Sequence, residues 1–444
     1  MQRMRIAVVG AGIAGLGAAW LLRRRHEVVV FERNGHLGGH SNTIEVPSSD
    51  GPVGVDTGFV VYNERNYPHL TRLFRHLDVE TQPTDMSFAA SIDDGRIEYA
   101  GSDVSSLFAQ RGNLVSPAYW GMLRDILRFN RDGKRSLRSG DAEGLSLGAY
   151  LARGGYGARL ADHYLLPMAA AIWSCPTRTM REFPAVSFLH FFENHGLLDL
   201  GDRPQWRTVV GGSRRYVERL AADLVGRASI SQPATRVRRT PDAAWLHTAD
   251  GASHRFDAVV LACHADEALR LIEAPRPAET AVLSKFGYQE NRTILHTDVA
   301  LMPKQRRVWS SWNYLAATSA AGTERVSVSY WMNQLQRLPG DRQLFVSLNP
   351  LREPRADEVI AELSYHHPVF DADAMRAQRL LPQLQGRDRL WFCGSYAGYG
   401  FHEDALASAV EVARLLGAET PWTLEAPAAD RAGVRLTPSD ALAS

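Results

Sequence analysis

Three glycines near the start of the chain have the spacing that a dinucleotide site requires. They form the motif Gly10-Ala-Gly12-Ile-Ala-Gly15. In such a turn the first glycine permits a tight bend, the second lets the backbone approach a pyrophosphate, and the third lets a helix pack on the preceding strand. Glu32 follows seventeen residues after Gly15 and can accept hydrogen bonds from a ribose diol. The segment therefore predicts a dinucleotide-binding site.

The elements that must position these residues can be read from the same segment. Residues 5–9 and 27–31 are short apolar runs that predict buried strands, and residues 14–25 predict a helix between them. A helix that begins directly after the turn offers its N–H groups to phosphates. The uncharged stretch 6–22 behind a basic start is also typical of a secretory signal. The glycines inside this stretch favour the dinucleotide turn.

Further motifs follow at the two ends of the chain. Glu32-Arg33 leads into Gly38-Gly39-His40 and then Val55-Asp56-Thr57-Gly58, and Trp391-Phe392-Cys393-Gly394-Ser395 precedes the segment 398–406. These motifs resemble those of FAD enzymes in the flavin amine oxidase and phytoene desaturase superfamily. His40 stands where the superfamily usually has Arg, and Ser395 stands where it has an acid. In the middle, Thr235-Arg-Val237 and Asp257–His264 are similar to two further superfamily elements, with His264 replacing a proline.

The resemblance implies FAD, held non-covalently, as the cofactor. Carried over position by position, it implies that these residues bind the cofactor: Gly10, Gly12, Ile13, Ala14, Gly15, Glu32, Arg33, Gly38, Gly39, His40, Thr57, Gly58, Val237, Ala262, Gly394, Ser395, Gly400, Phe401, His402 and Glu403. A helix that starts near residue 403 would point its positive end at the negative charge of a reduced flavin.

The chain of 444 residues is longer than the roughly 250–300 residues at which single cores divide. We predict an α/β fold, with a Rossmann-type, GR2-like FAD-binding domain and an inserted α+β substrate-binding domain. The FAD-binding domain is expected in three pieces, 1–60, 205–275 and 385–420. The substrate domain is expected from 61–204 and 276–384, and 421–444 is expected to be a poorly ordered tail.

Within the superfamily, the chain resembles bacterial predicted oxidoreductases associated with cyclopropane-fatty-acid-synthase-like lipid methyltransferases. The segments that carry this resemblance are 38–43, 55–63, 171–174, 191–198 and 309–314. The resemblance implies a lipid or fatty-acyl substrate, and a lipid methyltransferase as a partner.

Aromatic-rich segments outside the FAD pieces are the candidates for a substrate tunnel, since such a tunnel needs large apolar walls. The predicted substrate-binding residues are Trp173, Phe192, Asn194, His195, Trp312 and Asn313. For any single one of them an ordinary hydrophobic core is the alternative explanation, whereas the set as a whole, next to a flavin, favours a hydrophobic substrate. Lys304 and His402 are the candidate catalytic residues: superfamily oxidases often place a Lys near the flavin, and His402 opens the last helix. A surface role for Lys304 stays open.

The segment 117–132 predicts a helix with Ser116 as N-cap and Pro117 at its first position. It carries Trp120 among apolar residues and several arginines. Such a basic amphipathic helix can lie on a membrane surface, and packing on the substrate domain is the alternative.

The overall composition further restricts the classes of function and partner that the chain can have. The formal net charge is +1, which argues against a nucleic-acid partner. The three cysteines lack paired spacing, so we expect no disulfide framework, no metal site and a reducing, cytoplasmic setting, with peripheral contact at the inner face of the membrane as an option. Residues 165–173 form the longest uncharged apolar run outside the glycine segment, far short of the roughly 20 needed to span a bilayer.

These observations lead to a ranked set of functions. The first is an FAD-dependent oxidoreductase that abstracts hydride from, and so desaturates, a methylated or otherwise modified fatty acyl chain. The alternatives are a flavin amine oxidase and a flavin-dependent fatty-acid double-bond isomerase. A non-enzymatic FAD-binding partner of a lipid methyltransferase is the remaining reading.

Overall fold

Five parallel strands carry the N-terminal glycine turn. Their order is β10-β2-β1-β14-β20, and their bounds are β1 Arg5–Val9, β2 Glu27–Phe31, β10 Ala228–Ser229, β14 Ala258–Leu261 and β20 Leu390–Phe392. The computed structural model describes residues 2–424, except 50, 102–103, 174–176, 200, 202–203, 227, 230–231 and 319–323. The predicted strands 5–9 and 27–31 are confirmed, and they pair in register from Arg5 with Glu27 to Val9 with Phe31.

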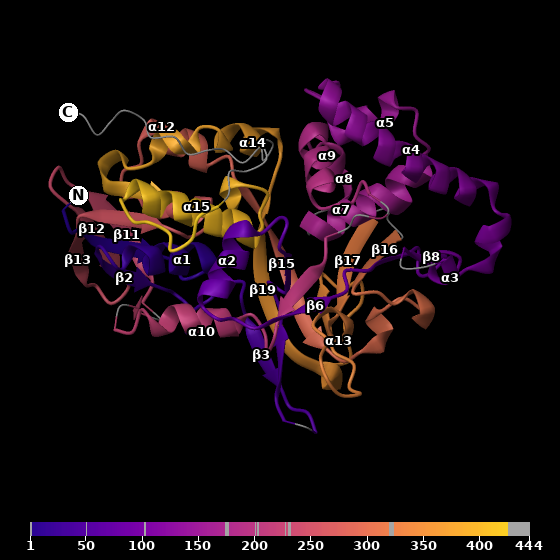
Figure 1. The fold of residues 1–444 in the computed structure, drawn as a ribbon, viewed down its shortest axis with the longest axis horizontal. Helices are drawn as coiled ribbons and strands as arrows, with labels where there is room; N and C mark the ends of the chain where they lie inside the picture. The colour runs from indigo at the N-terminus through magenta and orange to yellow at the C-terminus, as the bar shows by residue number, and fades with distance from the viewer. Residues whose placement is uncertain are drawn as a thin grey trace.

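Both faces of this sheet are covered, as the continuous apolar sequence of its strands requires. Alternate side chains of β1 enter two different cores: Ile6 and Val8 enter one, and Ala7 and Val9 enter the other. The first core is closed by helices α1 (Ile13–Leu22), α10 (Arg214–Ala222) and α15 (His402–Leu415). Figure 1 shows α1 and α15 side by side over the sheet.

The second core lies under a small antiparallel sheet and three helices. These elements are β11 (Ala234–Arg239), β12 (Ala244–Thr248), β13 (Ser253–Phe256), α11 (Ala265–Leu271), α12 (Pro277–Leu283) and α14 (Ala372–Gln378). The mixed α/β architecture with a Rossmann-type sheet is therefore as predicted.

A second sheet of seven strands forms the other half of the molecule, in the order β19-β15-β18-β17-β16-β7-β8. The strands are β7 Phe88–Ile92, β8 Ile97–Ala100, β15 Gly287–His296, β16 Trp312–Thr318, β17 Glu324–Trp331, β18 Phe345–Leu348 and β19 Val359–Val369. Polar and apolar residues alternate over 326–332 and 343–348, which predicts two antiparallel strands. These strands correspond to β17 and β18, which pair antiparallel.

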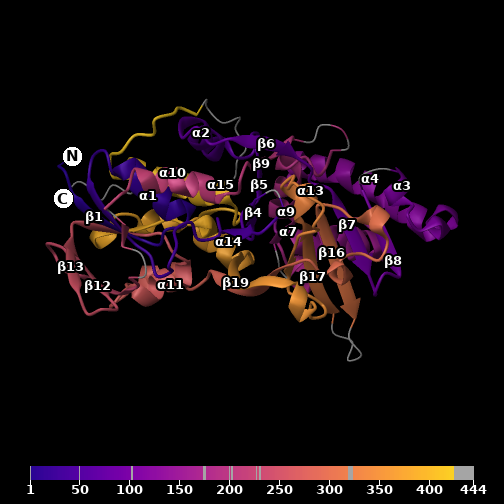
Figure 2. The same ribbon diagram turned by 90° about the horizontal axis from the view of Figure 1, so that it is seen from below.

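Helices cover one face of this sheet, as Figure 2 shows for α4, α7 and α9 above β7, β8, β16 and β17. They are α3 Val104–Leu107, α4 Pro117–Ser139, α5 Leu147–Arg153, α6 Ala158–Leu160, α7 Leu166–Trp173, α8 Thr177–Arg181 and α9 Ala185–Asn194. Ala170 and Ala171 of α7 pack against Tyr314 of β16 and Val328 of β17.

Shorter elements connect the two halves. They are β3 Thr43–Val46, β4 Val53–Asp56, β5 Val61–Asn63, β6 Thr81–Thr84, β9 Trp206–Val209, α2 Pro68–His76 and α13 Met332–Leu335. The sequence also predicts helices over 63–77 and 211–225. The first begins only at Pro68, because Asn63 ends β5 and its side chain closes a turn on the Asn66 amide. The second begins at Arg214, because Gly211 and Gly212 have positive φ angles.

The helix predicted over 117–132 is longer than expected. Ser116 caps it by accepting from the Tyr119 amide, and it continues to Gly140, whose φ of 75° ends it. Among the described residues, no helix combines the length and apolar character needed to cross a bilayer. The domain boundaries predicted from the sequence stay a prediction, and residues 425–444 of the predicted tail lie outside the described residues.

Candidate active site

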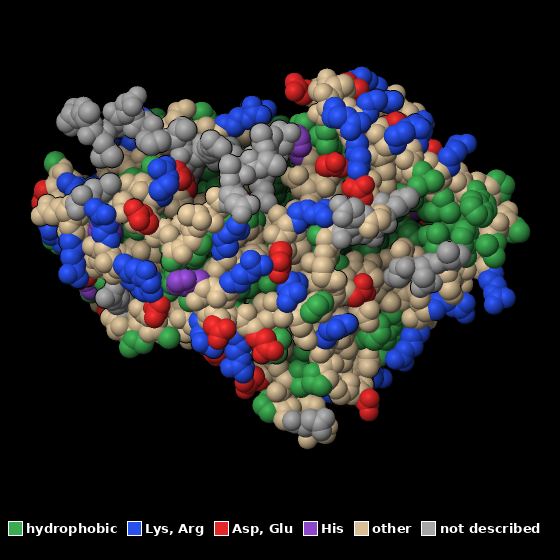
Figure 3. All heavy atoms as spheres, in the orientation of Figure 1, with side chains coloured by type: hydrophobic (Ala, Val, Ile, Leu, Met, Phe, Trp, Pro, Cys, Tyr) green, Lys and Arg blue, Asp and Glu red, His purple; other side chains and the backbone are tan. Residues whose placement is uncertain are grey.

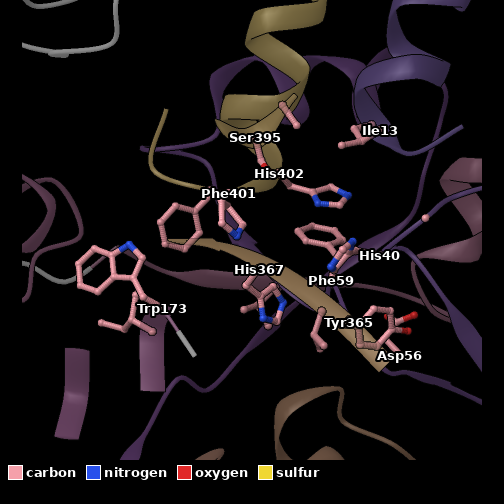
Figure 4. Close-up of a pocket in the computed structure, with 18 of the residues that line it drawn as sticks. Ile13, His40, Asp56, Phe59, Trp173, Tyr365, His367, Ser395, Phe401 and His402 are labelled. Atoms are coloured by element: carbon pink, nitrogen blue, oxygen red, sulfur yellow. The ribbon is translucent and has the colours of Figure 1, made fainter. Parts of the chain in front are cut away.

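A cavity of about 1350 Å³ extends from the carboxyl ends of β1, β2 and β14 to the seven-stranded sheet and its helices. Ligands of open α/β sheets bind at this end of the strands. Figure 4 shows side chains from the glycine turn, the 40–59 segment, β19, α7 and the start of α15 around this space.

The glycine turn forms one end of the cavity, and each of its glycines is required for a different physical reason. Gly10 has a φ of 99°, and a Cβ there would lie 2.8 Å from the Ala262 carbonyl oxygen. A Cβ on Gly15 would overlap the Gly10 carbonyl oxygen. A Cβ on Gly12 would meet no protein atom within 4 Å, although Gly12 lines the cavity. Gly12 thus leaves space for a ligand, as a pyrophosphate site requires.

Glu32 lies beside this turn at the end of β2. Its carboxylate is buried and accepts hydrogen bonds from the Ala11 and Asn34 amides, both at 2.8 Å. Each carboxylate oxygen has a second acceptor position, so the side chain can also receive a ribose diol. Arg33, the next residue, forms an ion pair with Glu267 at the cavity wall.

The segment from Gly38 to Phe59 folds over the turn. The Gly38 amide donates to the Ala11 carbonyl at 2.8 Å, and the Phe59 amide donates to the His40 carbonyl at 2.8 Å. A Cβ on Gly58 would overlap the same His40 carbonyl. Nε2 of His40 is buried and has no partner among the described residues. An unsatisfied buried nitrogen in a cavity wall fits a site that a polar ligand completes.

Histidines surround His40. Its ring centroid lies 5.4 Å from that of His367 and 6.4 Å from that of His264. Burial, followed by the neighbouring histidines, holds the pKa of His40 well below its usual range. Burial also lowers the pKa of His367 to about 4. These imidazoles are therefore neutral near pH 7. At the position of His40, the superfamily that this chain resembles usually has an arginine, which is cationic.

His402 is the first residue of α15 and lines the cavity. Its ring stacks on Phe59 with the centroids 3.8 Å apart. Its Nε2 lies 2.9 Å from Ser41 Oγ and 2.8 Å from Tyr216 Oη. Burial lowers the pKa of His402 to about 3. A neutral ring held by two hydroxyls is a positioned polar group and not a proton donor at neutral pH.

Asp56 joins the two halves of the structure at the cavity wall. Its carboxylate accepts from the Ser213 amide and hydroxyl, the Thr43 hydroxyl and Gln336 Nε2 at 2.5–2.9 Å. Burial raises the pKa of Asp56 to about 6 in spite of these hydrogen bonds. The four donors show why an acid is present at this position of the Val55–Gly58 motif.

The other end of the cavity is apolar. Trp173 and Ile172 of α7, Phe191 of α9, and Met122 and Ile126 of α4 line it. The Trp173 ring contacts Phe191 with centroids 4.6 Å apart. Among the described residues, the carboxylates that line the cavity are those of Glu32, Asp56, Asp85 and Glu267, and each accepts a hydrogen bond from the protein.

The structure brings most of the predicted site residues to this cavity. The cofactor-site candidates that line it are Gly10, Gly12, Ile13, Ala14, Glu32, Arg33, Gly38, Gly39, His40, Thr57, Gly58, Ala262, Gly394, Ser395, Gly400, Phe401 and His402. The substrate-site candidates that line it are Trp173, His195 and Trp312. Their roles stay predictions.

Three cofactor-site candidates lie behind the wall. Gly15 is buried under the turn. The Val237 carbonyl accepts the Glu273 amide at 3.0 Å, and it is Ala234 and Thr235 of the same strand that reach the cavity. The Glu403 carboxylate accepts the His69 and Leu70 amides at 2.9 and 3.0 Å, so it caps α2 instead of lining the cavity.

Three substrate-site candidates and Lys304 do not line it either. Phe192 stacks on Phe188 inside the helical core, 4.1 Å between centroids. Asn313 Nδ2 donates to the Ser310 and Ser329 carbonyls, and Asn194 ends α9 away from the cavity wall. The Lys304 side chain is more than half exposed, and its ammonium pairs with Asp94 at 2.7 Å. Lys304 therefore lies at the surface and does not line the cavity, contrary to its expected place near the flavin.

Sequence reasoning missed Tyr365, and it offered His367 only as one of several lone histidines that could be acid–base groups. Tyr365 and His367 alternate along β19 and face the cavity with His40. The Tyr365 hydroxyl lies 2.7 Å from Thr57 Oγ1. The period-two alternation in β19 was an available signal, but no local feature indicated which face of that strand meets the glycine turn.

The fold and the glycine-turn site define a class of protein: a dinucleotide-binding α/β protein with a long apolar pocket beside its cofactor site. Comparison with known proteins specifies the class. The profile of the flavin containing amine oxidoreductase family matches residues 13–416, and the chain belongs to this family. FAD is its cofactor, and the open Gly12, Glu32 and unpartnered His40 Nε2 fit such a group.

Two curated relatives illustrate the family. A Mycobacterium tuberculosis protein named as a flavin-containing monoamine oxidase is 27% identical over 250 residues, which are 53% of this chain and 51% of that protein. The carotenoid phi-ring synthase of Streptomyces griseus is 26% identical over 292 residues, 61% of this chain and 54% of that protein. The chain thus spans about half the length of the curated relatives it matches.

Solved structures share the fold across almost the whole chain. A putrescine oxidase bound to putrescine has a TM-score of 0.67 at 14% identity and covers 94% of this chain and 99% of its own. A fatty acid isomerase from P. acnes that produces CLA has a TM-score of 0.65 at 16% identity and covers 93% of this chain and 98% of its own.

Proposed function

We propose that this FAD-dependent oxidoreductase acts on a fatty-acyl-type chain and removes hydrogen from it to form a double bond. The observation that supports this most is the apolar end of the cavity, walled by Trp173, Phe191, Ile172 and Ile126. A bound FAD, which we propose is held non-covalently, supplies a two-electron acceptor. The fatty acid isomerase and the carotenoid synthase among the compared proteins act on extended apolar molecules by their names, which supports the same class.

The carboxylates of the cavity argue against an amine substrate. A buried ammonium needs a counter-charge, because removing it from water without one is costly. Four acidic side chains of the described residues line the cavity, and none of them belongs to α4, α7 or α9, which form its apolar walls. An acyl chain makes no such demand, and the apolar walls exclude water around it.

The polar residues next to the apolar walls would position the chain. His402 is neutral and held by Ser41 and Tyr216, so it can orient a ligand without adding charge. Helix α15 begins at His402 in the cavity wall, so the positive end of its dipole lies beside this space. These groups would fix the place along the chain where reaction occurs.

The test is anaerobic mixing of the FAD-loaded protein with plain unsaturated, methyl-branched and cyclopropanated fatty acids and phospholipids, beside mono- and polyamines. Methylated chains are included because of the resemblance to a group associated with lipid methyltransferases. We expect loss of the flavin absorbance near about 450 nm with an acyl substrate and a product two hydrogens lighter. Reduction by amines and by no lipid would overturn the proposal in favour of amine oxidation.

Two further outcomes would also overturn it. Migration of a double bond without flavin reduction would make the enzyme an isomerase, and no reduction by any compound would make the flavin structural.

A matched pair of variants tests whether the acyl chain binds at the apolar wall of the cavity. Ile172→Glu should abolish reduction by the acyl chain while the flavin content is kept, because it buries a charge in the apolar wall. Ile172→Leu should retain the reaction.

A further inference from the structure

Large exposed hydrophobic side chains gather at one end of the molecule. Leu114, Val115, Trp120 and Leu127 are 50–84% exposed, and they make up half of the large exposed hydrophobic residues found in the described part of the chain. Figure 3 shows hydrophobic side chains clustered at the end of the molecule where α4 begins, with cationic side chains beside them. A contiguous apolar patch on a monomer usually marks a contact surface.

Helix α4 has two apolar faces with different surroundings. Met122, Ile126 and Phe129 point inward, where the first two line the cavity and Phe129 enters the helical core. Trp120 and Leu127 lie two turns apart on the opposite, exposed side. Arg124 and Arg131 share this stripe, because positions 120, 124, 127 and 131 repeat with the helical period.

The charge of this region contrasts with that of the whole chain. Residues 111–139 hold seven cationic side chains and two carboxylates, a net charge of +5, whereas the full chain has +1. Both carboxylates turn inward: Asp125 accepts the Gly157 amide at 2.9 Å, and Asp132 accepts the Tyr156 hydroxyl at 3.1 Å. Arg124 and Arg131 contact these acids through guanidinium nitrogens, and their side chains stay 81% and 73% exposed.

The cavity reaches the surface beside this patch. Leu123 of α4 and Leu107 of α3 line the cavity and are partly exposed, and Gly101 lines it and is exposed. An apolar chain that enters at this edge would pass from the exposed face of α4 to its inner face within one helix diameter, about 10 Å.

We propose that the α4 surface, formed by Leu114, Val115, Trp120, Arg124, Leu127 and Arg131, docks on an anionic lipid bilayer and delivers the acyl chain to the cavity. The inference rests on the proposed acyl substrate. The apolar side chains would enter the boundary between head groups and acyl chains, and the arginines would bind lipid phosphates. A protein partner with an acidic face is the competing occupant, but the cavity edge at the same place favours lipid.

The experiment is co-sedimentation of the FAD-loaded protein with vesicles of phosphatidylcholine alone or with added phosphatidylglycerol, at low and high salt. We expect binding only to the anionic vesicles, weakened by salt. The double variants Val115→Glu/Trp120→Glu and Arg124→Glu/Arg131→Glu should each lower the partition coefficient at least about tenfold. The flavin spectrum of each variant reports that it is folded and loaded.

Matched controls use exposed hydrophobic residues elsewhere, Val225→Glu and Leu380→Glu, which should leave vesicle binding unchanged. Equal binding of neutral and anionic vesicles, unchanged binding of the α4 variants, or a dimer that these variants dissolve would each overturn the proposal. Reduction of the flavin by a detergent-dispersed acyl substrate is measured alongside. If that reduction occurs without vesicle binding, the docking inference fails and the proposed function stands. If vesicles bind but no acyl chain reduces the flavin, the proposed function fails.

Discussion

At the scale of single residues, two glycines of one motif are required for different reasons. Gly15 is required by the protein itself, because any Cβ would overlap the Gly10 carbonyl oxygen. Gly12 is required only by a ligand, because its Cβ position is open to the cavity. The contrast separates folding from cofactor binding within a single turn.

We therefore expect Gly12→Val to fold but to lose FAD. The valine side chain has room in the protein, and it occupies the space that a pyrophosphate needs. The ratio of flavin absorbance to protein absorbance should fall to near zero, while far-UV circular dichroism stays that of the parent. Gly287→Val is the control, since its Cβ position is also open but lies away from the cavity. Normal flavin content in Gly12→Val would show that the phosphates bind elsewhere.

At the scale of elements, the start of α15 is tied to the start of α2. Glu403, in the first turn of α15, accepts the first free amides of α2 from His69 and Leu70. A carboxylate at a helix N-terminus satisfies N–H donors and opposes the helix dipole. One acidic residue thus fixes α2 against the helix that carries His402 into the cavity.

We expect Glu403→Gln to lower the free energy of unfolding by about 1–3 kcal/mol, because a charged acceptor of two buried amides is lost. Urea denaturation followed by circular dichroism would measure it. Glu411→Gln on the same helix removes only a surface pair with Arg414 and should cost less than about 1 kcal/mol. If both variants lost the same stability, the cap would contribute nothing beyond a surface charge.

At the scale of the whole molecule, the interior of the seven-stranded sheet holds a buried histidine in its neutral form. Burial lowers the pKa of His296 in the seven-stranded sheet to about 4, and its Nε2 lies 2.8 Å from Ser347 Oγ. Below about pH 6.5 the His296 imidazole binds a proton in the unfolded chain, whereas in the folded chain it stays neutral down to about pH 4. His296 therefore destabilises the fold as the pH falls through this window.

The variant His296→Gln should remove that contribution. Its unfolding free energy relative to the parent should rise by about 1.4 kcal/mol for each pH unit below 6.5, or about 2 kcal/mol between pH 6.5 and pH 5. Because the two proteins share every other titratable group, the difference reports the histidine. Urea unfolding at both pH values tests it, and a difference independent of pH would mean that folding leaves the pKa of His296 unchanged.

The sequence alone was sufficient wherever the determinants are local. The strand, turn and helix around Gly10–Gly15 need only neighbouring residues, because the glycines act on adjacent backbone and the apolar runs define the strands. Ser116 and Pro117 likewise set the start of α4, since a cap acts within one turn. The FAD motifs and the α/β class followed from such local patterns.

The tertiary structure decided which side chains meet. Phe191 and Phe192 are adjacent and similar in type, yet Phe191 lines the cavity and Phe192 stacks in the core, because consecutive helical side chains point about 100° apart. His40 and His367 meet only because β19 returns to the glycine turn across more than three hundred residues. Neither the composition of the chain nor the spacing of its motifs predicts this contact. The contact depends on how the two sheets pack, and not on any residue near either histidine.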